Sequence, residues 1–291
     1  MQPSPPPDPR VDWDLPAFGA MPRVARLDEV THRVLADNPS PMTLDGTNTY
    51  VVAPPGAGVA LVVDPGPDVS AHFDAVAGVL DDVDARPVAV AVTHHHVDHS
   101  EAAQAWAAHW SCPVVASDAD VAGPSGRTIS DGDRLDVPGL RVDVVATPGH
   151  SADHLAFRLG TGGLLTGDHV LGRGTTVVNH PDGNLSAYLD SLTRTVRLQA
   201  DVLYPGHGPA LREDPTAVLH HHLLHREFRL GQIMAALADG PRQPHELVAE
   251  IYADHDPAVW PAAEASTRAA LAHLAERGQV AWEGDIARRT A

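Results

Sequence analysis

The chain has 291 residues, of which 43% are hydrophobic and 20% charged, so it is too long for a disulfide-stapled miniprotein and should fold around its own core. Its 38 acidic and 20 basic residues leave a formal net charge of −18, which excludes a broad basic surface for wrapping nucleic acid and restricts any such contact to a local site. Because it has a single cysteine, Cys112, no signal-peptide pattern and no long apolar run, we expect a cytoplasmic protein without membrane contact.

Residues 1–22 are rich in proline and polar residues without periodicity, which predicts an N-terminal arm that is extended over the surface or partly disordered. Between residues 23 and 225, short β-rich runs alternate with helical patterns. The expected strands are 48–52, 59–63, 88–92, 140–145 and 155–159, and the expected helices are 71–83 and 101–110. This alternation predicts an α/β domain whose sheets are covered by helices on the outside.

The composition turns helical after residue 215, with expected helices at 217–237, 244–252 and 261–277 and a hairpin at 279–289. This order of elements predicts a winged-helix-like domain over residues 226–291. The segment contains 7 arginines and 10 acidic residues, a net charge of −3, whereas a nucleic-acid-binding module carries a basic face. A packing or dimerisation module, which would make the chain a homodimer, is therefore as good a hypothesis as nucleic-acid contact.

Metal-binding side chains are densest at residues 93–99, Thr-His-His-His-Val-Asp-His, directly after the strand expected at 88–92. At such a strand exit, His94 and His96 point the same way, while Asp98 and His99 follow in the next turn. Four donors within six positions are more than one zinc ion could use together with distant ligands. The spacing therefore predicts two metal ions.

Three further acidic or histidine side chains each follow a strand-like run. They are His150 in TPGHS, Asp168 in TGDH and His207 in YPGHG. Loops at strand ends hold side chains on a rigid scaffold within reach of a substrate. We therefore expect these residues to join the same site.

In this order and spacing, the motifs resemble the ligand set of the metallo-β-lactamase superfamily. The resemblance implies a four-layer αββα sandwich with the site at one edge, between the two sheets. It implies one metal on His94, His96 and His150, a second on Asp98, His99 and His207, and Asp168 as the bridge between them. Asp64 in VVDPG matches the first motif of the superfamily, and the resemblance implies that it orients the ligand loop without binding the metal.

The resemblance also implies the chemistry. Two Zn²⁺ ions per chain, or iron or manganese in their place, would hold a bridging hydroxide that attacks the substrate, because zinc lowers the pKa of bound water to about 7. Asp98 would act as the catalytic side chain that orients this nucleophile. The only cysteine lies outside every ligand motif, which disfavours the zinc β-lactamases that use a cysteine ligand.

Segments outside the ligand set, at residues 38–50, 149–154, 167–172 and 225–227, resemble the lactamase-beta-like protein 2 family. That family contains a single-stranded-RNA endoribonuclease and thioesterases that release polyketides from carrier protein. The resemblance implies a hydrolase of an ester-type bond, first of all a thioester or carboxylic ester on a small molecule or an acyl carrier. The alternatives are cleavage of single-stranded RNA and a non-catalytic module with structural metals that binds nucleic acid or a partner.

Five residues outside the ligand set are hypotheses for substrate contact: Asn48, Asn179, Tyr188, His225 and Arg226. For Tyr188 a core position is the more ordinary interpretation, since it lies in a helical run. The histidines at 220–222 and 225 predict a helix-surface cluster, because no acidic or cysteine partner nearby completes a metal site with them. Strand alternation directs His95 away from the ligands, and His154 and His169 are expected to make hydrogen bonds in the core.

Overall fold

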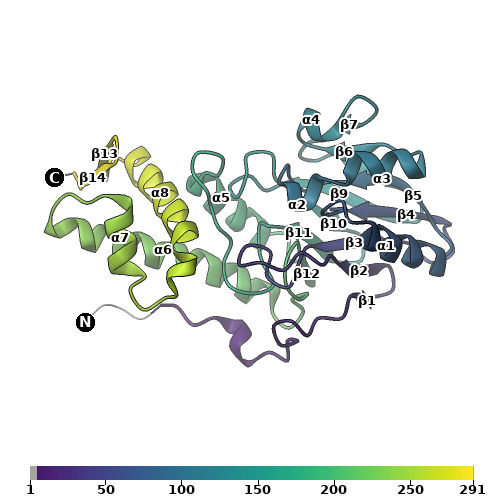
Figure 1. Cartoon of the computed structure of the whole chain (residues 1–291), viewed down its shortest axis with the longest axis horizontal. Helices are drawn as coiled ribbons and strands as arrows, with labels where there is room; N and C mark the ends of the chain where they lie inside the picture. The colour runs from purple at the N-terminus through teal and green to yellow at the C-terminus, as the bar shows by residue number, and fades with distance from the viewer. Residues whose placement is uncertain (1–4, 291) are drawn as a thin grey trace.

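The computed structural model describes residues 5–290 and contains two large sheets (Figure 1). The first sheet has the strand order β1 to β7: β1 (Val24–Arg26), β2 (Thr31–Leu35), β3 (Asn48–Val52), β4 (Val59–Val63), β5 (Arg86–Ala91), β6 (Val114–Ala116) and β7 (Arg127–Thr128). The second has the order β12 (Val202–Pro205), β11 (Gly163–Gly167), β10 (Leu155–Leu159), β9 (Leu140–Ala146) and β8 (Arg134–Val137). The predicted α/β class is confirmed.

Helices cover the outer face of each sheet. Those against the first sheet are α1 (Ser70–Asp82), α3 (Ala103–Trp110) and α4 (Ala119–Ala122), and those against the second are α5 (Leu185–Val196) and α6 (Pro215–Ala236). A one-turn helix, α2 (Val97–Ser100), follows β5. The molecule therefore has the predicted order of four layers, helices, sheet, sheet and helices.

Side-chain alternation explains why the central strands are apolar throughout. In β4, Leu61 and Val63 join the core between the two sheets, while Ala60 and Val62 join the core beneath α1 and α3. Because both faces of the strand are covered, all of its positions favour apolar residues.

The strand directions place several strand ends at one edge. Strand β4 runs parallel to β5, and β11 runs parallel to β12. Strands β9 and β11 both pair antiparallel with β10, so they point the same way. The loops that follow β9, β11 and β12 therefore leave the second sheet at the same edge, where loops can bring side chains together.

The C-terminal part consists of α7 (Pro244–Ile251), α8 (Trp260–Glu276) and the hairpin β13 (Val280–Glu283) and β14 (Ile286–Arg289), with short 3-10 turns η2 (Leu237–Asp239) and η3 (Pro257–Val259). This is the predicted order of helix, helix and hairpin. Helix α6 continues without a break across residue 225, so the predicted domain boundary lies inside a helix. One hydrophobic cluster includes Leu164 of the second sheet, Leu219 of α6 and Leu271 of α8, and it joins the two parts.

The N-terminal arm lies against the body of the protein. It contains the 3-10 turn η1 (Pro9–Asp12), and the Arg10 guanidinium is buried, donating to the carbonyl oxygens of Leu171 at 2.9 Å and Gly174 at 2.7 Å. These bonds hold residues 5–22 over the surface, and the remainder of the predicted arm, residues 1–4, lies outside the described residues. Within residues 5–290, no helix has the length and apolar character needed to cross a membrane.

Candidate metal centre

All seven predicted metal ligands lie together at the edge where the strands end. His94 and His96 follow β5, and Asp98 and His99 lie in α2. The other three come from the second sheet, because His150 follows β9, Asp168 follows β11 and His207 follows β12. Residues more than 100 positions apart in the chain thus meet at one point.

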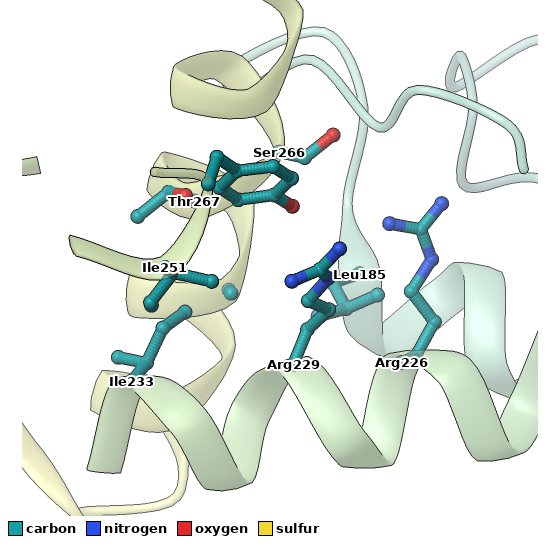
Figure 2. A pocket seen from close by; sticks show the side chains of 9 residues that line it. Leu185, Arg226, Arg229, Ile233, Ile251, Ser266 and Thr267 are labelled. Carbon is teal, nitrogen blue, oxygen red and sulfur yellow. The ribbon is translucent and has the colours of Figure 1, made fainter. Parts of the chain in front are cut away.

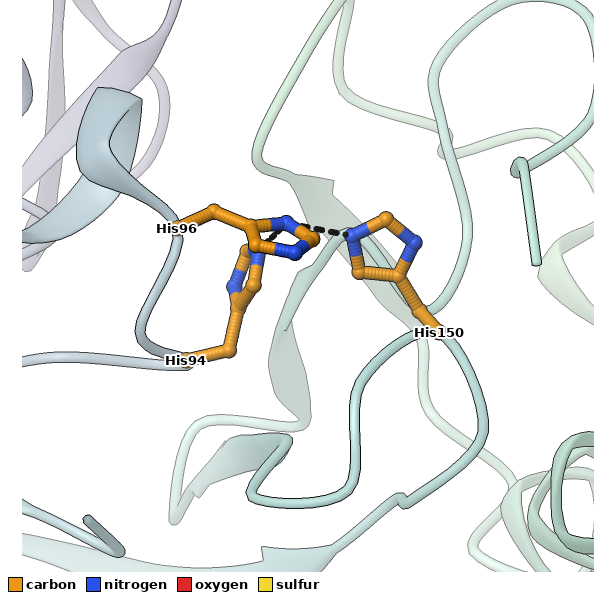
Figure 3. Close-up of side chains that lie close together, drawn as sticks. All are labelled: His94, His96 and His150. Carbon is orange, nitrogen blue, oxygen red and sulfur yellow. Dashed lines mark hydrogen bonds between the residues drawn. The ribbon is translucent and has the colours of Figure 1, made fainter. Parts of the chain in front are cut away.

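Three histidines form the first group of donors, and Figure 3 shows their rings converging. The Nδ1 atom of His96 lies 3.0 Å from Nε2 of His94 and 3.0 Å from Nε2 of His150. Ligand atoms of a tetrahedral zinc site, each about 2.0 Å from the metal, stand roughly 3.3 Å apart. The spacing therefore fits three ligands around one ion.

Asp98, His99 and His207 form the second group. The Nε2 atom of His207 lies 3.2 Å from Nε2 of His99 and 3.2 Å from Oδ2 of Asp98. The two groups share Asp168, whose Oδ2 is 3.6 Å from Nε2 of His150 and 3.4 Å from Nε2 of His207. Asp168 thus stands between the groups, as a bridging carboxylate would.

The far side of each ring faces a fixed acceptor. Nδ1 of His150 donates to the carbonyl oxygen of Val177 at 2.7 Å, and Nδ1 of His207 donates to that of Gly46 at 3.1 Å. Nδ1 of His99 donates to Oδ2 of Asp64 at 2.9 Å. When Nδ1 carries the proton, Nε2 presents a lone pair toward the cluster. The Nε2 atoms of His99 and His207 then face each other as two acceptors, an arrangement that a cation between them satisfies.

Asp64 supports the ligand loop from below. It is buried, with φ at 52°, and its carboxylate accepts from the backbone N–H and the hydroxyl of Thr93, both at 2.8 Å, as well as from His99. The Thr93 hydroxyl also lies 3.0 Å from Nδ1 of His94. One carboxylate thereby connects ligands of both groups, in the place expected of a residue that orients them.

Two further observations fit a metal at this place. Oδ1 of Asp168 is buried and has no hydrogen-bond partner within residues 5–290, and a buried carboxylate oxygen needs one. The backbone at Gly206 lies so close that a Cβ there would stand 2.6 Å from that oxygen and 2.7 Å from Cε1 of His99. The donor set of imidazoles and carboxylates suits zinc, iron or manganese.

The charge balance of the cluster also favours a cation. Burial lowers the pKa of His207, but the carboxylates of Asp168 and Asp98 outweigh it and raise that pKa to about 10. For Asp168, burial raises the pKa, yet His207 and His99 hold it well below its usual range. The ionised carboxylates thus attract positive charge, and a metal held by these residues would take the place of the proton on His207.

The sequence of residues 42–207 matches the family model described as the metallo-beta-lactamase superfamily. The chain belongs to the metallo-beta-lactamase superfamily. Residues 244–289 match a second model, the beta-lactamase associated winged helix domain, which confirms the winged-helix prediction. Proteins of this superfamily are generally hydrolases, and the His and Asp cluster makes this member a metal-dependent hydrolase.

Named relatives support this assignment over most of the chain. A beta-lactamase-like protein 2 homolog of Drosophila melanogaster is 30% identical over 278 residues, 89% of this chain and 92% of the relative. Lactamase-like protein aptB of Emericella nidulans is 32% identical over 92% of this chain and 89% of its own length. A beta-lactamase domain protein from Burkholderia ambifaria has the same fold, with a TM-score of 0.78, 24% identity and 97% coverage of both chains. The predicted resemblance to the lactamase-beta-like protein 2 family is confirmed.

The structure corrects three of the five substrate-contact predictions. Asn48 is buried, and its amide donates to the carbonyl oxygens of Pro205 at 2.9 Å and Gly208 at 2.8 Å, so it supports the His207 loop. Tyr188 and Arg226 are also buried, and they donate to the carbonyl oxygens of His169 at 3.0 Å and of Thr176, so both support the loop that follows β11. Asn179 is exposed and His225 half-buried, and substrate contact by these two residues stays a prediction.

The predicted helix-surface cluster of histidines is wrong for two of its members. His222 is fully buried, with Nδ1 3.1 Å from the Tyr188 hydroxyl, and His221 is buried, with Nδ1 donating to the carbonyl oxygen of Pro7 at 3.0 Å. The N-terminal arm lies over this part of α6 and covers His221. His154 and His169 make core hydrogen bonds as predicted, to Thr147 at 2.8 Å and Thr195 at 3.0 Å.

Sequence reasoning missed Asp182. Its Oδ2 lies 3.3 Å from Nε2 of His96 and 3.8 Å from Nε2 of His95. The prediction that His95 points away from the ligands does not hold for His96: their ring centres are 4.7 Å apart, and with Asp182 the two histidines form a third group of possible metal donors. Nδ1 of His95 lies 2.9 Å from Asp153. Asp182 is part of a Pro-Asp-Gly sequence that looks like an ordinary turn, so nothing in the sequence indicated its position beside a ligand.

Proposed function

We propose that the chain uses two metal ions, with zinc as the first choice, to hydrolyse a thioester or carboxylic ester. The observation that carries the proposal is the pair of donor groups that share Asp168. A structural zinc site is a closed tetrahedral set of protein ligands around one ion, whereas here two donor groups share one carboxylate and the side chains of His96 and Asp98 are partly exposed. When bound, such metals would supply an activated water and polarise a carbonyl group. The paired, partly exposed donor groups argue against the alternative of purely structural metals.

The chain's own side chains define where a substrate approaches. The side chain of His96 is 31% exposed and that of Asp98 is 27% exposed, while those of His94, His99 and His207 are almost fully buried. Solvent and substrate therefore reach the cluster past His96 and Asp98. Burial alone would raise the pKa of Asp98, but His207 and His99 have the larger effect, so the pKa lies below its usual value. This carboxylate is therefore ionised, and it can accept a hydrogen bond or a proton at the opening.

The charges at this opening favour an uncharged acyl group over a phosphodiester. Asp153 and Asp182, which lie outside the set of predicted metal ligands, stand beside His95 and His96. Carboxylates repel the phosphates of RNA, and their effect is strongest where burial limits screening. We therefore place a small-molecule or carrier-bound acyl thioester ahead of single-stranded RNA as the substrate.

The test compares both substrate classes on the same preparation. Zinc-loaded protein is assayed with a panel of small acyl thioesters and carboxylic esters and with a labelled single-stranded RNA. Asp168→Ala should lower the rate of hydrolysis by more than about 100-fold. Even replacing residues that only hydrogen-bond to a metal ligand lowers metal affinity or activity about 10- to 100-fold. Asp190→Ala, which removes an exposed carboxylate of α5, is the matched control and should keep full activity.

Cleavage of RNA that Asp168→Ala abolishes, without turnover of any ester, would overturn the proposed substrate. Hydrolysis that persists in Asp168→Ala after its metal content has fallen would overturn the proposed role of the site. Salt provides a second readout, since binding through several phosphates weakens steeply with ionic strength and binding of a small ester does not.

A further inference from the structure

A small pocket lies between α6 and the C-terminal helices, away from the metal ligands (Figure 2). Its cavity is small, with about 20 Å³ of positions open to the centre of a water molecule. Its apolar wall is formed by Leu185, Ile233, Ile251 and Ala270, and its polar wall by Arg226, Arg229, Tyr252, Ser266 and Thr267. Figure 2 shows both arginine side chains rising from α6 into this space, with Ser266 across from them on α8.

The two arginines bring positive charge into the pocket without a counter-charge. Within residues 5–290, neither Arg226 nor Arg229 has a carboxylate oxygen within 4.0 Å, whereas seven other arginines do. Arg226 is 6% exposed and Arg229 half-buried. Burial of an unpaired cation is costly. In a chain with a net charge of −18, acidic partners are plentiful, so their absence here favours a ligand that supplies the negative charge.

Both guanidinium groups keep donors free. Arg226 donates from Nη2 to the carbonyl oxygen of Thr176, and Arg229 donates from Nη1 to Gln232 at 2.9 Å. The Nε atoms of both are buried and have no hydrogen-bond partner within the described chain. Each guanidinium has five N–H donors in a planar fork, so several remain for a ligand. Arg229 also lies over the ring of Tyr252, 4.2 Å from its centre, which fixes its orientation.

A neighbouring histidine is affected by these charges. Burial together with Arg226 and Arg229 lowers the pKa of His225 to about 3. His225 therefore stays neutral and adds no positive charge, while the potential of the two arginines remains uncompensated. Helix α5 begins at Leu185 on the pocket wall. The positive end of its helix dipole adds to the positive potential of the two arginines.

We propose that this pocket binds one phosphate-sized oxyanion, either free phosphate or the phosphate group of a small monoester. Arginine forks match the oxygens of phosphate in geometry and charge. The small space and the apolar wall suit a single such group and exclude a stacked nucleotide or a polynucleotide backbone. The proposal concerns a place separate from the metal ligands and does not depend on which bond the protein hydrolyses.

The experiment titrates inorganic phosphate into the metal-loaded protein by calorimetry at low ionic strength. Arg229→Gln removes one charge and its fork, and Arg197→Gln removes an exposed arginine at the end of α5 as the matched control. Arg226 is left intact because its partner Thr176 donates to the carbonyl oxygen of Asp168 at 2.9 Å. We expect one saturable site, weakened at least 10-fold by Arg229→Gln, partly restored by Arg229→Lys and unchanged by Arg197→Gln.

Three results would overturn the proposal. They are no saturable phosphate binding, the same phosphate affinity in Arg229→Gln as in the unaltered protein, and a loss of affinity in Arg197→Gln as large as that in Arg229→Gln. Equal binding by Arg229→Gln would place the ion elsewhere, including at the metals. Thermal unfolding of each variant shows whether the fold is retained. A second titration with glycerol 3-phosphate distinguishes the source, since tighter binding than that of inorganic phosphate identifies a monoester as the ligand.

Discussion

The carboxylate of Asp64 accepts a hydrogen bond from Nδ1 of His99 at 2.9 Å, and both side chains are almost fully buried. This bond fixes the proton on Nδ1 and directs Nε2 toward Asp98 and His207. Through Thr93 the same carboxylate also steadies the loop of His94. The residue that follows β4 therefore controls the geometry of ligands that follow β5.

Replacement of Asp64 should weaken metal binding more than it changes the fold. Asp64→Asn keeps the shape of the side chain but removes the charge that holds the His99 proton, and metal affinity should fall about 10- to 100-fold. Competition with a chelator measures it. Asp68→Asn, an exposed carboxylate four residues away, is the control. Unchanged affinity in Asp64→Asn would contradict the role of this hydrogen bond.

Metal-free protein should lose stability as the pH rises. Burial lowers the pKa of His207, but Asp168 and Asp98 outweigh burial and raise this pKa to about 10. In the unfolded chain the value is about 6.5. The native state then binds the extra proton, so this contribution is complete below pH of about 6.5 and is lost by about 10. Denaturant unfolding of chelator-treated protein across this range measures the slope. His207→Asn should flatten it, and an equal slope in that variant would contradict the assignment.

The affinity for metal should rise over the same pH range. The metal competes with the proton on His207, so each step toward higher pH removes the competitor. Proton release on zinc addition, measured in buffers of different ionisation enthalpy, should include about one proton from His207 at pH 7 and fall to about half of that near pH 10. A fall in proton release that is complete by pH 8 would show that another group titrates.

Gly206 should not tolerate a side chain. A Cβ there would stand 2.6 Å from Oδ1 of Asp168 and 2.7 Å from His99, so Gly206→Ala should displace ligands and lower metal content. The matched control is Gly78→Ala in α1, where, apart from the neighbouring helix backbone, a Cβ would meet no atom of residues 5–290 within 4 Å. That control should keep its metal and gain about 0.5–1 kcal/mol in free energy of unfolding, because alanine favours helices. Full metal content in Gly206→Ala would contradict the close approach.

Removal of Arg10 should loosen the N-terminal arm and the loop after β11. Its guanidinium donates to the carbonyl oxygens of Leu171 and Gly174, and buried hydrogen bonds to a charged group are worth about 1.5–3 kcal/mol. Arg10→Ala should lower the free energy of unfolding by roughly that amount and expose the arm to proteolysis. Arg197→Ala serves as the surface control. Protease resistance equal to that of the unaltered protein would contradict the docking of the arm by Arg10.

The metal centre was the part most readily predicted from sequence, for a local reason. His94, His96, Asp98 and His99 lie within six positions, where the strand exit and the following helical turn determine their directions. The distant ligands could be predicted because each follows a strand, and strands of the same direction end at the same edge of a sheet. The helices and the hairpin of the C-terminal part were likewise visible as periodic patterns.

The roles of Asn48, Tyr188 and Arg226 could not be predicted in this way. Each is polar and lies near a motif in the sequence, which suggested a substrate contact. Whether such a side chain faces solvent depends on what packs over it, and here the covering segments come from residues 157–160 positions away for Asn48 and 50 positions away for Arg226.

The sequence by itself therefore determined the order of the elements, the family and the donor set, because these follow from short-range periodicity and from residue types at strand ends. Only the tertiary structure decided which polar side chains are buried supports, that Asp182 stands beside His96, and that Arg226 and Arg229 line one pocket with no carboxylate oxygen of residues 5–290 within 4.0 Å. The physical reason is that burial and the pairing of charges arise from contacts between segments far apart in the chain, and these contacts leave no periodic pattern within any one of them.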